Sequence, residues 1–354
     1  MIKGFGVYSK GNVGWIERKD YVCGPDDVIA KPIALAPCSS DVHTAYEMEG
    51  PHLINRILGH ESIGRLIEVG SNVKDFKVGD RVVIPCTTPT WKHPGIQDGT
   101  HQDAGGPFAA INFSSYEDGT FAEKIKVRSA DMNLALLPDD VSIEAAVMAT
   151  DMMTTGFYGS ELGDVKFGDT VVVFGIGPIG LMAVAGAKLR GAGQLIAIGT
   201  RPNCVALAKE YGATDILSYK DGDLVEQIME RTNGRGADVA IVAGGGVESL
   251  NNALASVKAG YGNVAMLEVI TETETLEIPN AYAGGFLFHK TIRGGLCPGG
   301  RRRMERLLSM IQSKRVDPGK LITHKFDGLE SIEEAFHLMV DKPRDLIKPI
   351  VYLE

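Results

Sequence analysis

The feature that most constrains the fold of this chain is residues 169–201, DTVVVFGIGPIGLMAVAGAKLRGAGQLIAIGTR. They open with a β-favouring run at 171–174 and pass through the turn GIGPIG at 175–180. An apolar run rich in small residues follows, and a second apolar strand is expected at 195–198. Strand, glycine turn, helix and strand in this order predict a βαβ unit of a dinucleotide-binding sheet.

Each glycine of this G-x-G-x-x-G turn has a steric reason for its position. Gly175 permits the tight turn, Gly177 lets the backbone approach a pyrophosphate, and Gly180 lets the helix pack closely on the strand. The free N–H groups and the dipole at the start of the helix favour bound phosphate. An ordinary glycine-rich loop is the alternative, but the strand–helix setting favours nucleotide binding.

The end of the second strand indicates which nucleotide binds. NAD-binding chains usually carry Asp or Glu there, about 20 residues after the turn, to hold the ribose 2′-hydroxyl. This chain instead reads Gly199-Thr200-Arg201. A hydroxyl and a guanidinium can bind a 2′-phosphate, and no carboxylate repels it. A surface arginine is the alternative, and we favour NADP over NAD.

Composition and charge narrow the class of protein. With 354 residues, 44% of them apolar, and 43 glycines, the chain suits a loop-rich enzyme with two domains. The net charge of −9 argues against binding to nucleic acid. The N-terminus lacks the apolar core of a signal peptide, and glycines and a proline interrupt the uncharged stretch 170–187. Five cysteines without paired spacing suit a reducing compartment, so we expect a cytoplasmic protein that does not contact membranes.

The periodicity of the chain changes near residue 154. Residues 1–150 contain short strand patterns between turn residues, as in an antiparallel β domain, with the last strand expected at 121–127. Residues 154–295 alternate helix and strand patterns, which predicts a doubly wound parallel sheet. The C-terminal part contains helix patterns at 302–314 and 331–341 and a strand pattern at 347–353. We therefore predict an α/β protein in which residues 1–153 and 296–354 form one domain and residues 154–295 the other.

Two further segments bear on the organisation. Residues 91–119 are polar and glycine-rich without periodicity, and we expect a long loop there. The arginines at 301–303 and 306 lie at a predicted helix start, which indicates a solvated or subunit-facing helix surface.

Three residues of the first domain are candidate metal ligands. Cys38 follows an apolar strand and a proline, His60 lies in GHE, and Asp151 lies in TDMMTTG. They are far apart in sequence, so spacing alone predicts no common site. A buried thiol, a hydrogen-bonded histidine and an aspartate at a helix N-terminus are the respective alternatives.

Longer motifs resolve these alternatives. The run from Gly59 through Val73 has the form G-H-E-x2-G-x5-G-x2-V, the zinc signature of the medium-chain alcohol dehydrogenases. The blocks APC-x-SD-x-HT, DMMTTGF, GIGP-x-GLMAVAGAKLRGAG, HKTI-x-GGLCPGGR and KP-x-DLIKP resemble the NADP-dependent secondary alcohol dehydrogenases of anaerobic microbes. The resemblance covers essentially the whole chain. It implies a GroES-like antiparallel β catalytic domain beside a Rossmann doubly wound domain.

The resemblance also implies a catalytic zinc ion. Its ligands would be Cys38, His60 and Asp151, with Glu61 beside or intermittently on the metal, which leaves a fourth position for water or substrate. Many relatives carry a second, structural zinc held by four cysteines in the lobe that corresponds to residues 91–119. This segment has no cysteine, so we expect one catalytic zinc and no structural zinc.

The same resemblance implies the remaining roles. Ser40 would contact the oxygen of the alcohol or ketone substrate, and His43 would continue a proton relay; a strand-end cap and a surface imidazole are the respective alternatives. The residues expected around NADP(H) are Thr154, Thr155, Gly175, Gly177, Pro178, Gly180, Gly199, Thr200, Arg201 and Tyr219. The family suggests a homotetramer. A polyol or other alcohol dehydrogenase using NAD(P) and a non-catalytic NADP-binding protein are the alternative functions.

Three places depart from the relatives. Ile111 stands near a tryptophan of the relatives, and Cys86 stands where an alanine is common. The relatives have an Asn-Tyr-Phe-Gly run after the penultimate Rossmann strand, where this chain reads VAMLEV at 264–269. The loss of two aromatic walls predicts a wider substrate pocket and a substrate bulkier than a short secondary alcohol.

Overall fold

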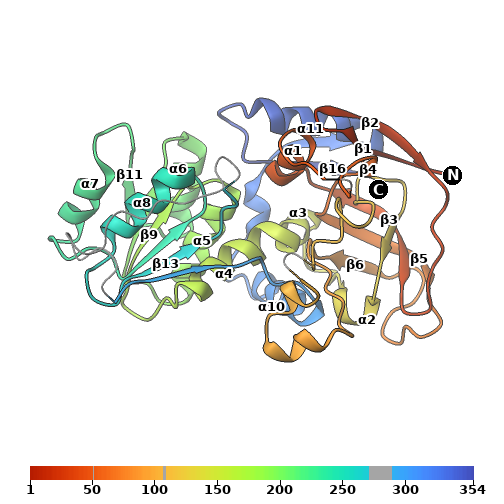
Figure 1. Ribbon diagram of the computed structural model, residues 1–354, viewed down its shortest axis with the longest axis horizontal. Helices are drawn as coiled ribbons and strands as arrows, with labels where there is room; N and C mark the ends of the chain where they lie inside the picture. Colours follow the sequence, from red (N-terminus) through yellow and green to blue (C-terminus); the bar gives the residue numbers. More distant parts are fainter. Residues whose placement is uncertain (51, 107–108, 271–288) are drawn as a thin grey trace. The chain divides into compact units, whose positions relative to one another are not determined.

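The computed structural model describes residues 1–50, 52–106, 109–270 and 289–354 (Figure 1). They form two compact units. Unit 1 contains Met1–Thr154 and Cys297–Glu354, and unit 2 contains Thr155–Leu296.

Unit 1 is built on two sheets. The smaller has the order β2-β1-β4, and the larger has the order β15-β16-β3-β5-β6-β8, with β7 also paired to β3. Within the described residues, all pairs in these sheets are antiparallel except β15 with β16. The strands are β1 (Ile2–Ser9), β2 (Asn12–Arg18), β3 (Val28–Leu35), β4 (Arg56–Ile57), β5 (Ser62–Val69), β6 (Arg81–Ile84), β7 (Ile125–Val127), β8 (Ala135–Leu136), β15 (Ile322–Asp327) and β16 (Lys348–Tyr352).

Short helices connect and cover these strands. The α-helices of unit 1 are α1 (Ser39–Tyr46), α2 (Ala130–Asn133), α3 (Ile143–Met148), α10 (Arg301–Gln312) and α11 (Ile332–Asp341). A π-helical turn, η3 (Ala149–Met153), continues α3 into the next helix. Four 3₁₀ turns are η1 (Pro94–Asp98), η2 (His101–Asp103), η4 (Pro318–Leu321) and η5 (Leu329–Ser331).

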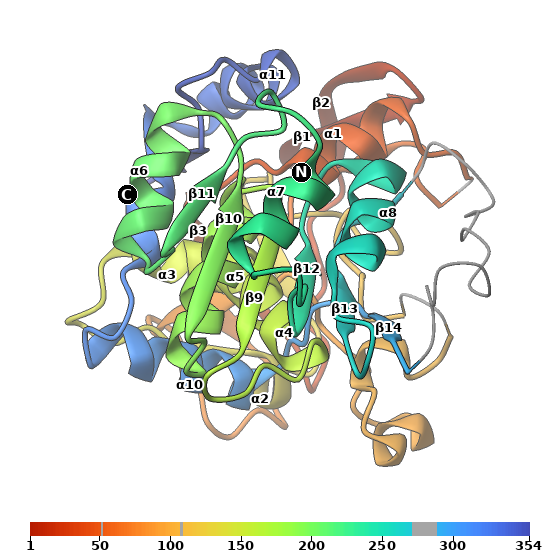
Figure 2. The same cartoon turned by 90° about the vertical axis from the view of Figure 1, so that its left-hand side faces the viewer.

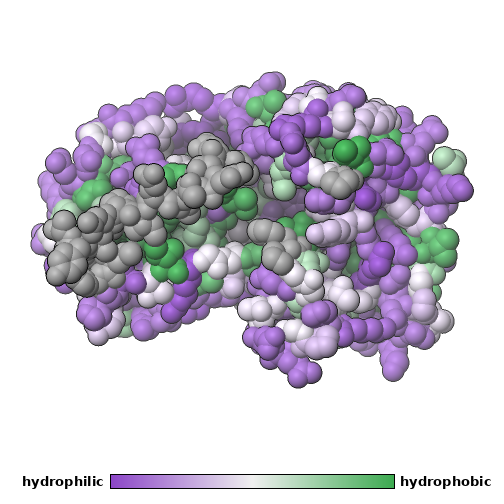
Figure 3. Space-filling model, viewed as in Figure 1, coloured by the Kyte–Doolittle hydropathy of each residue, from purple (hydrophilic) through white to green (hydrophobic). Residues whose placement is uncertain are grey.

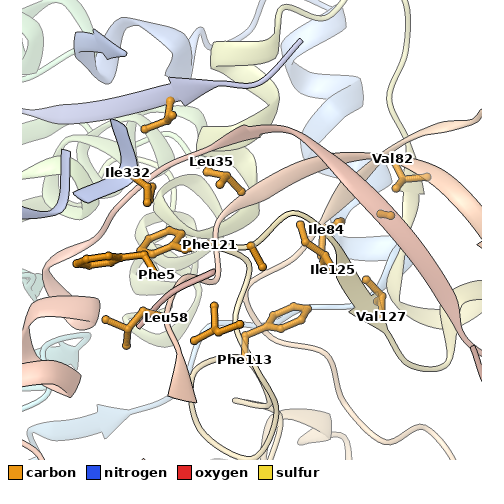
Figure 4. Packing of buried hydrophobic residues seen from close by; sticks show 14 of the residues in the cluster. Phe5, Leu35, Leu58, Val82, Ile84, Phe113, Phe121, Ile125, Val127 and Ile332 are labelled. Carbon is orange, nitrogen blue, oxygen red and sulfur yellow. The ribbon is translucent and has the colours of Figure 1, made fainter. Parts of the chain in front are cut away.

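Aliphatic side chains and a few phenylalanine rings fill the core of unit 1 (Figure 4). Phe5 of β1 is fully buried, and its ring centroid lies 5.8 Å from that of Trp15 and 5.4 Å from that of Phe336. Phe121 is also fully buried, and its carbonyl accepts a hydrogen bond of 2.8 Å from the N–H of Phe5. Burial of these large apolar side chains is the main stabilisation that the small sheets receive.

In the part of unit 2 that the structure describes, six strands form a parallel sheet in the order β11-β10-β9-β12-β13-β14 (Figure 2). The chain runs outward from β9 to β11, then returns beside β9 and runs outward again, so the order reverses between β9 and β12. Its strands are β9 (Thr170–Phe174), β10 (Gln194–Ile198), β11 (Asp215–Leu217), β12 (Val239–Val242), β13 (Asn263–Met266) and β14 (Thr291–Gly294). Ligands of such sheets bind beyond the carboxyl ends of the strands at this reversal.

Helices connect the strands from β9 to β13. They are α5 (Pro178–Leu189), α6 (Pro202–Glu210), α7 (Leu224–Arg231) and α8 (Gly246–Ser256), and α4 (Thr154–Leu162) precedes β9. Leu224 and Ile228 of α7 and Leu250 of α8 pack with Val172 and Phe174 of β9 in one hydrophobic core. Consecutive βα units of this kind give the doubly wound arrangement.

The predicted fold class is confirmed, with local corrections. The strand expected at 121–127 begins only at Ile125, because the N–H of Phe121 instead donates to Leu58 in a loop. The strand β15, in which half-buried and exposed positions alternate, was missed because ITHKFD lacks an apolar run. Residues 91–119 contain η1 and η2 rather than only a loop. The first of the clustered arginines, Arg301, begins α10 and forms ion pairs with Asp75 and Glu305.

Figure 3 shows hydrophilic residues over most of the face in view, with apolar residues in small groups. Among the residues that the structure describes, no helix has the length and apolar character needed to cross a bilayer.

Substitution of Phe5 tests the role of the aromatic core. We expect Phe5→Ala to destabilise unit 1 by about 3–5 kcal/mol, because the cavity forfeits both transfer energy and ring contacts. Phe167→Ala is the matched control, since 93% of this side chain is exposed, and it should change stability by at most about 0.5 kcal/mol. Thermal unfolding followed by circular dichroism measures both. Equal melting temperatures for the two variants would contradict this account.

Candidate metal centre and nucleotide site

Cys38 is positioned by the transition from β3 to α1. It precedes the first residue of α1 in extended conformation, and its N–H donates to Oδ2 of Asp41 at 2.9 Å. A carboxylate at the third helical position that accepts from the preceding N–H is one half of a capping box. The cap therefore fixes the backbone from which the Cys38 thiol projects.

His60 lies between β4 and β5, and its two ring nitrogens have different environments. Nδ1 lies 3.1 Å from Oδ1 of Asp41, whereas Nε2 lies 3.2 Å from Oγ of Ser40 and 3.4 Å from Oδ2 of Asp151. The Nδ1 contact with a carboxylate sets the tautomer that leaves Nε2 available as a metal ligand.

Asp151 reaches the same place from another element. It lies in the π-helical turn η3 between α3 and α4, and its Oδ2 is 4.0 Å from Sγ of Cys38. A π-helical turn changes the direction of side chains relative to a regular α-helix and is frequent at functional sites. The alternative of a helix N-terminal cap therefore does not describe Asp151.

Four donors converge at this point. One ligand atom from each of Cys38, His60, Glu61 and Asp151 lies within 4.8 Å of the others. Burial opposes the thiolate of Cys38, but the Lys348 charge and a hydrogen bond with His60 outweigh it and lower the Cys38 pKa. A lowered thiol pKa favours the thiolate, which is the form that binds metal. Sulfur, imidazole and carboxylate donors at this spacing suit zinc.

A buried ion pair lies behind the cluster. Nζ of Lys348 donates to Oε1 of Glu61 and, at 2.8 Å, to the carbonyl of Pro37, and both charged side chains are at most 1% exposed. Burial opposes the charge of Lys348, but the anions Cys38 and Glu61 outweigh it and raise the Lys348 pKa. Oε2 of Glu61 is buried without a hydrogen-bond partner among the described residues. This second oxygen is therefore available to a cation.

Sequence reasoning missed Asp41 and Lys348. Asp41 accepts hydrogen bonds from the N–H groups of Cys38 and Gly59 and contacts His60, so one carboxylate joins the two ligand-bearing segments. Its position three residues after Cys38 was a detectable capping signal. Lys348 comes from the final strand, and nothing local in the sequence marks it as a partner of Glu61.

A second group of donors adjoins the first. Sγ of Cys86 lies 3.3 Å from Sγ of Cys297, and these two sulfurs and a carboxylate oxygen of Asp151 lie within 4.8 Å of one another. The hydrogen bond with Cys297, together with burial, raises the Cys86 pKa well above its usual value.

Other expected site residues of unit 1 have definite contacts. Ser40 Oγ faces the cluster through His60, whereas His43 is on the exposed side of α1 with its Nδ1 2.5 Å from Oε2 of Glu47. No described hydrogen bond joins Ser40 to His43. Thr154 is buried and its hydroxyl donates to the carbonyl of Pro298 at 2.7 Å. The neighbouring Thr155 lies in the first turn of α4 and is buried.

The glycine turn of unit 2 follows β9 at the reversal of strand order. Gly175 has φ +81°, which L-residues with a side chain rarely adopt, and a Cβ on it would lie 2.9 Å from Cα of Gly244 after β12. A Cβ on Gly180 would lie 1.8 Å from the carbonyl oxygen of Gly175. The run 175–180 thus requires glycine at both positions. Helix α5 begins within this run, at Pro178.

The residues expected near the adenosine phosphate lie together beyond the ends of β10 and β11. The hydroxyls of Thr200 and Tyr219 are 3.1 Å apart, and Tyr219 is 58% exposed. A Cβ built on Gly177 would lie 3.9 Å from Nη2 of Arg201, which places the guanidinium beside the glycine turn. The preceding Gly199 packs closely on Ile176, the second residue of that turn.

Comparisons with known proteins agree with this geometry. Residues 24–139 match the family described as alcohol dehydrogenase GroES-like domain, and residues 178–313 match that described as zinc-binding dehydrogenase. The chain is 55% identical over 352 residues to the NADP-dependent isopropanol dehydrogenase of Thermoanaerobacter brockii, covering 99% of this chain and 100% of that protein. The chain belongs to the zinc-dependent medium-chain alcohol dehydrogenase family.

Further relatives place it within this family. The NADP-dependent isopropanol dehydrogenase of Clostridium beijerinckii is 52% identical, with 99% of this chain and 100% of that protein covered. The solved alcohol dehydrogenase TADH of Thermus sp. ATN1 has 26% identity and a TM-score of 0.86, with 99% of this chain and 100% of that chain covered. As a medium-chain alcohol dehydrogenase, the chain is close to the NADP-dependent secondary alcohol enzymes.

Substitution of Asp41 tests whether it organises the metal centre. In Asp41→Asn, an amide NH₂ must replace one of two oxygens that now accept hydrogen bonds, and the negative charge beside His60 disappears. We expect zinc affinity to fall by about 10–100-fold, the usual effect of changing the partner of a ligating histidine. Competition with a chromogenic chelator measures this affinity.

Asp139→Asn is the control, because the side chain of Asp139 is 99% exposed and pairs only with Arg81 among the described residues. Zinc affinity of this variant should match that of the unsubstituted protein. An unchanged affinity in Asp41→Asn would show that Asp41 does not position the ligands.

Proposed function

We propose that this chain is a zinc-dependent oxidoreductase that transfers hydride between NADP(H) and a secondary alcohol or its ketone. The observation that carries this proposal is the convergence of the Cys38, His60, Glu61 and Asp151 donors within 4.8 Å. The full-length relatives named isopropanol dehydrogenases support a secondary alcohol over a polyol. A non-catalytic NADP-binding protein would not need this buried donor set.

The charges of the site suit a divalent cation. When bound, zinc supplies a Lewis acid for the substrate oxygen and the nicotinamide exchanges the hydride. The thiolate of Cys38 and the carboxylate of Asp151 balance the two charges of zinc, while His60 contributes neutral Nε2. Lys348 balances Glu61. The proposed ligands and their ion pair are therefore close to neutral together, which reduces the cost of burying them.

Ser40 is the group that we propose exchanges a proton with the substrate oxygen. Its Oγ lies 3.2 Å from Nε2 of His60, so the hydroxyl is beside the proposed metal position. His43 is three residues further along α1 with 43% of its side chain exposed, which supports a role as the solvent end of the relay. In the described structure it contacts Glu47, so the relay requires a change of its side-chain rotamer.

The arrangement beyond the ends of β10 and β11 supports NADP(H) over NAD(H). Arg201, Thr200 and Tyr219 offer a guanidinium and two hydroxyls near the glycine turn. Charge-assisted hydrogen bonds from such groups suit a 2′-phosphate.

We further propose one catalytic zinc and no structural zinc. The lobe at 91–119 is held without cysteines: Trp91 stacks on His101 with ring centroids 5.2 Å apart, and its Nε1 donates to Asn133 at 2.7 Å. All five cysteines are unpaired, which supports a reducing, cytoplasmic location. A homotetramer is proposed from the family resemblance.

Zinc removal tests the proposed activity. After dialysis against metal-free buffer we expect one zinc per chain, and oxidation of propan-2-ol with NADP should vanish when a strong chelator removes this zinc. Readdition of one equivalent should restore activity, because the ligands come from a folded unit. Elemental analysis and NADPH absorbance provide the measurements. Undiminished activity in demonstrably zinc-free protein would refute the proposal.

Substitution of Arg201 tests cofactor choice. We expect Arg201→Asp to lower kcat/KM for NADP by about 10–100-fold, since a charged hydrogen bond worth about 1.5–3 kcal/mol is lost. The value for NAD should stay the same or rise. Arg235→Asp, an exposed position of the same unit, is the matched control and should leave the ratio unchanged. A preserved NADP preference in Arg201→Asp would exclude this role.

Ile111 is proposed to widen the substrate pocket. It is half-buried, and the neighbouring carbonyl of Ala110 accepts from the N–H of Thr88 at 2.9 Å, two residues from Cys86. We expect Ile111→Trp to lower kcat/KM about tenfold for branched ketones and to spare acetone, because added bulk is rejected sterically. A series of ketones of increasing size measures this. Activity of the unsubstituted enzyme confined to acetone would contradict the wider pocket.

A further inference from the structure

Cys86 and Cys297 form a buried thiol pair that the proposed reaction does not use. Their sulfurs are 3.3 Å apart, each residue is 6% exposed, and neither is in a disulfide. Together with a carboxylate oxygen of Asp151 they make a group of three donors within 4.8 Å. Asp151 is thus common to this group and to the proposed zinc ligands.

Backbone contacts hold the three donor segments together. The N–H of Cys86 donates to the carbonyl of Thr150 at 3.1 Å, directly before Asp151. The hydroxyl of Thr87 donates to the carbonyl of Cys297 at 3.3 Å. Gly299 approaches so closely that a Cβ on it would lie 2.1 Å from the carbonyl oxygen of Thr87. The pair is therefore a feature of packed backbone segments and not a chance encounter of mobile side chains.

We propose that Cys86, Cys297 and Asp151 form a second cation site, which takes a thiophilic divalent ion such as zinc in excess or cadmium. Two sulfurs and one carboxylate oxygen select soft or borderline cations over magnesium or calcium. Sulfurs bound to a tetrahedral zinc at about 2.3 Å lie about 3.8 Å apart, so the pair must open by about half an ångström. Binding exchanges the two thiol protons for the cation and releases them to solvent.

Occupation of the second site acts on the first through their common residue. Asp151 has two carboxylate oxygens, and a cation held by Cys86 and Cys297 would draw one of them away from the Cys38–His60 side. Cation above one equivalent should therefore lower the alcohol dehydrogenase activity by about tenfold, the scale seen when the surroundings of a ligand are altered. This consequence rests on the proposed function, whereas the binding itself does not.

Cadmium is the probe for the second site. Full-length reduced protein carrying one zinc is dialysed against Cd²⁺, and bound metals are counted by elemental analysis. We expect one cadmium in addition to the retained zinc, with ultraviolet thiolate-to-cadmium absorption for two thiolates. Displacement of zinc by cadmium with no additional ion bound, or the absence of thiolate absorption, would overturn the proposal.

Three variants test whether Cys86 and Cys297 cause the thiolate-to-cadmium absorption. Cys86→Ala and, independently, Cys297→Ser should lose the additional cadmium and its absorption while keeping one zinc. Cys204→Ala, which removes a buried thiol of unit 2, should keep both. Additional cadmium that persists in either pair variant would overturn the assignment. If neither variant folds, the metal count of the unsubstituted protein still decides.

The result is separable from the proposed function. A chain that binds cadmium through the pair but neither zinc nor NADP would retain this inference and lose the proposed activity. A chain that is an active zinc enzyme but binds no additional cadmium would lose only this inference.

Discussion

The metal centre depends on a single buried carboxylate. Asp41 joins the first turn of α1 to the loop before β5, since it accepts from the N–H groups of Cys38 and Gly59 and contacts Nδ1 of His60. These bonds fix two donors that lie more than twenty positions apart in sequence. Because the imidazole is held through Nδ1, its Nε2 faces the other donors, with Asp151 at 3.4 Å and Glu61 at 3.9 Å. The hydrogen bonds of Asp41 thus fix the positions of the metal ligands, although Asp41 itself is not a ligand.

Charge balance is the second requirement of the site. Two carboxylates and a thiol with a lowered pKa lie within 4.8 Å of one another, an arrangement that repels itself without a cation. Lys348, delivered by the last strand of the unit, supplies one permanent charge at Glu61. A bound divalent ion would supply the remaining positive charge. Because Lys348 supplies part of this positive charge, its strand is part of the site although it is remote from the ligands in sequence.

The sequence predicted the fold class well, because each local pattern has a direct physical cause. The glycine turn at 175–180 needs positive φ at Gly175 and contact without a Cβ at Gly180, and both requirements can be inferred from residue type. Segments whose pairing depends on distant partners were less predictable. The backbone at Phe121 is a loop because β1 and Leu58 take its hydrogen bonds, and β15 has no apolar run.

The donors of the site could be predicted from the sequence, but the residues that act through tertiary contacts could not. Cys38, His60 and Asp151 are recognisable as donors, but only the family resemblance joined them, since no spacing rule links positions so far apart. Asp41 and Lys348 were missed because their importance comes from tertiary contacts with Gly59 and Glu61. The Cys86–Cys297 pair was missed for the same reason, because the two residues meet only when β6 and the segment before α10 are folded together.

X-ray absorption at the zinc edge can decide whether one zinc ion binds at Cys38, His60 and Asp151. In protein loaded with one equivalent of zinc, we predict a single sulfur ligand at about 2.3 Å and the other ligands as nitrogen or oxygen at about 2.0–2.2 Å. Two sulfur ligands would place the ion at the Cys86–Cys297 pair instead, and no sulfur ligand would remove Cys38 from the site. Either result would refute zinc binding at Cys38, His60 and Asp151.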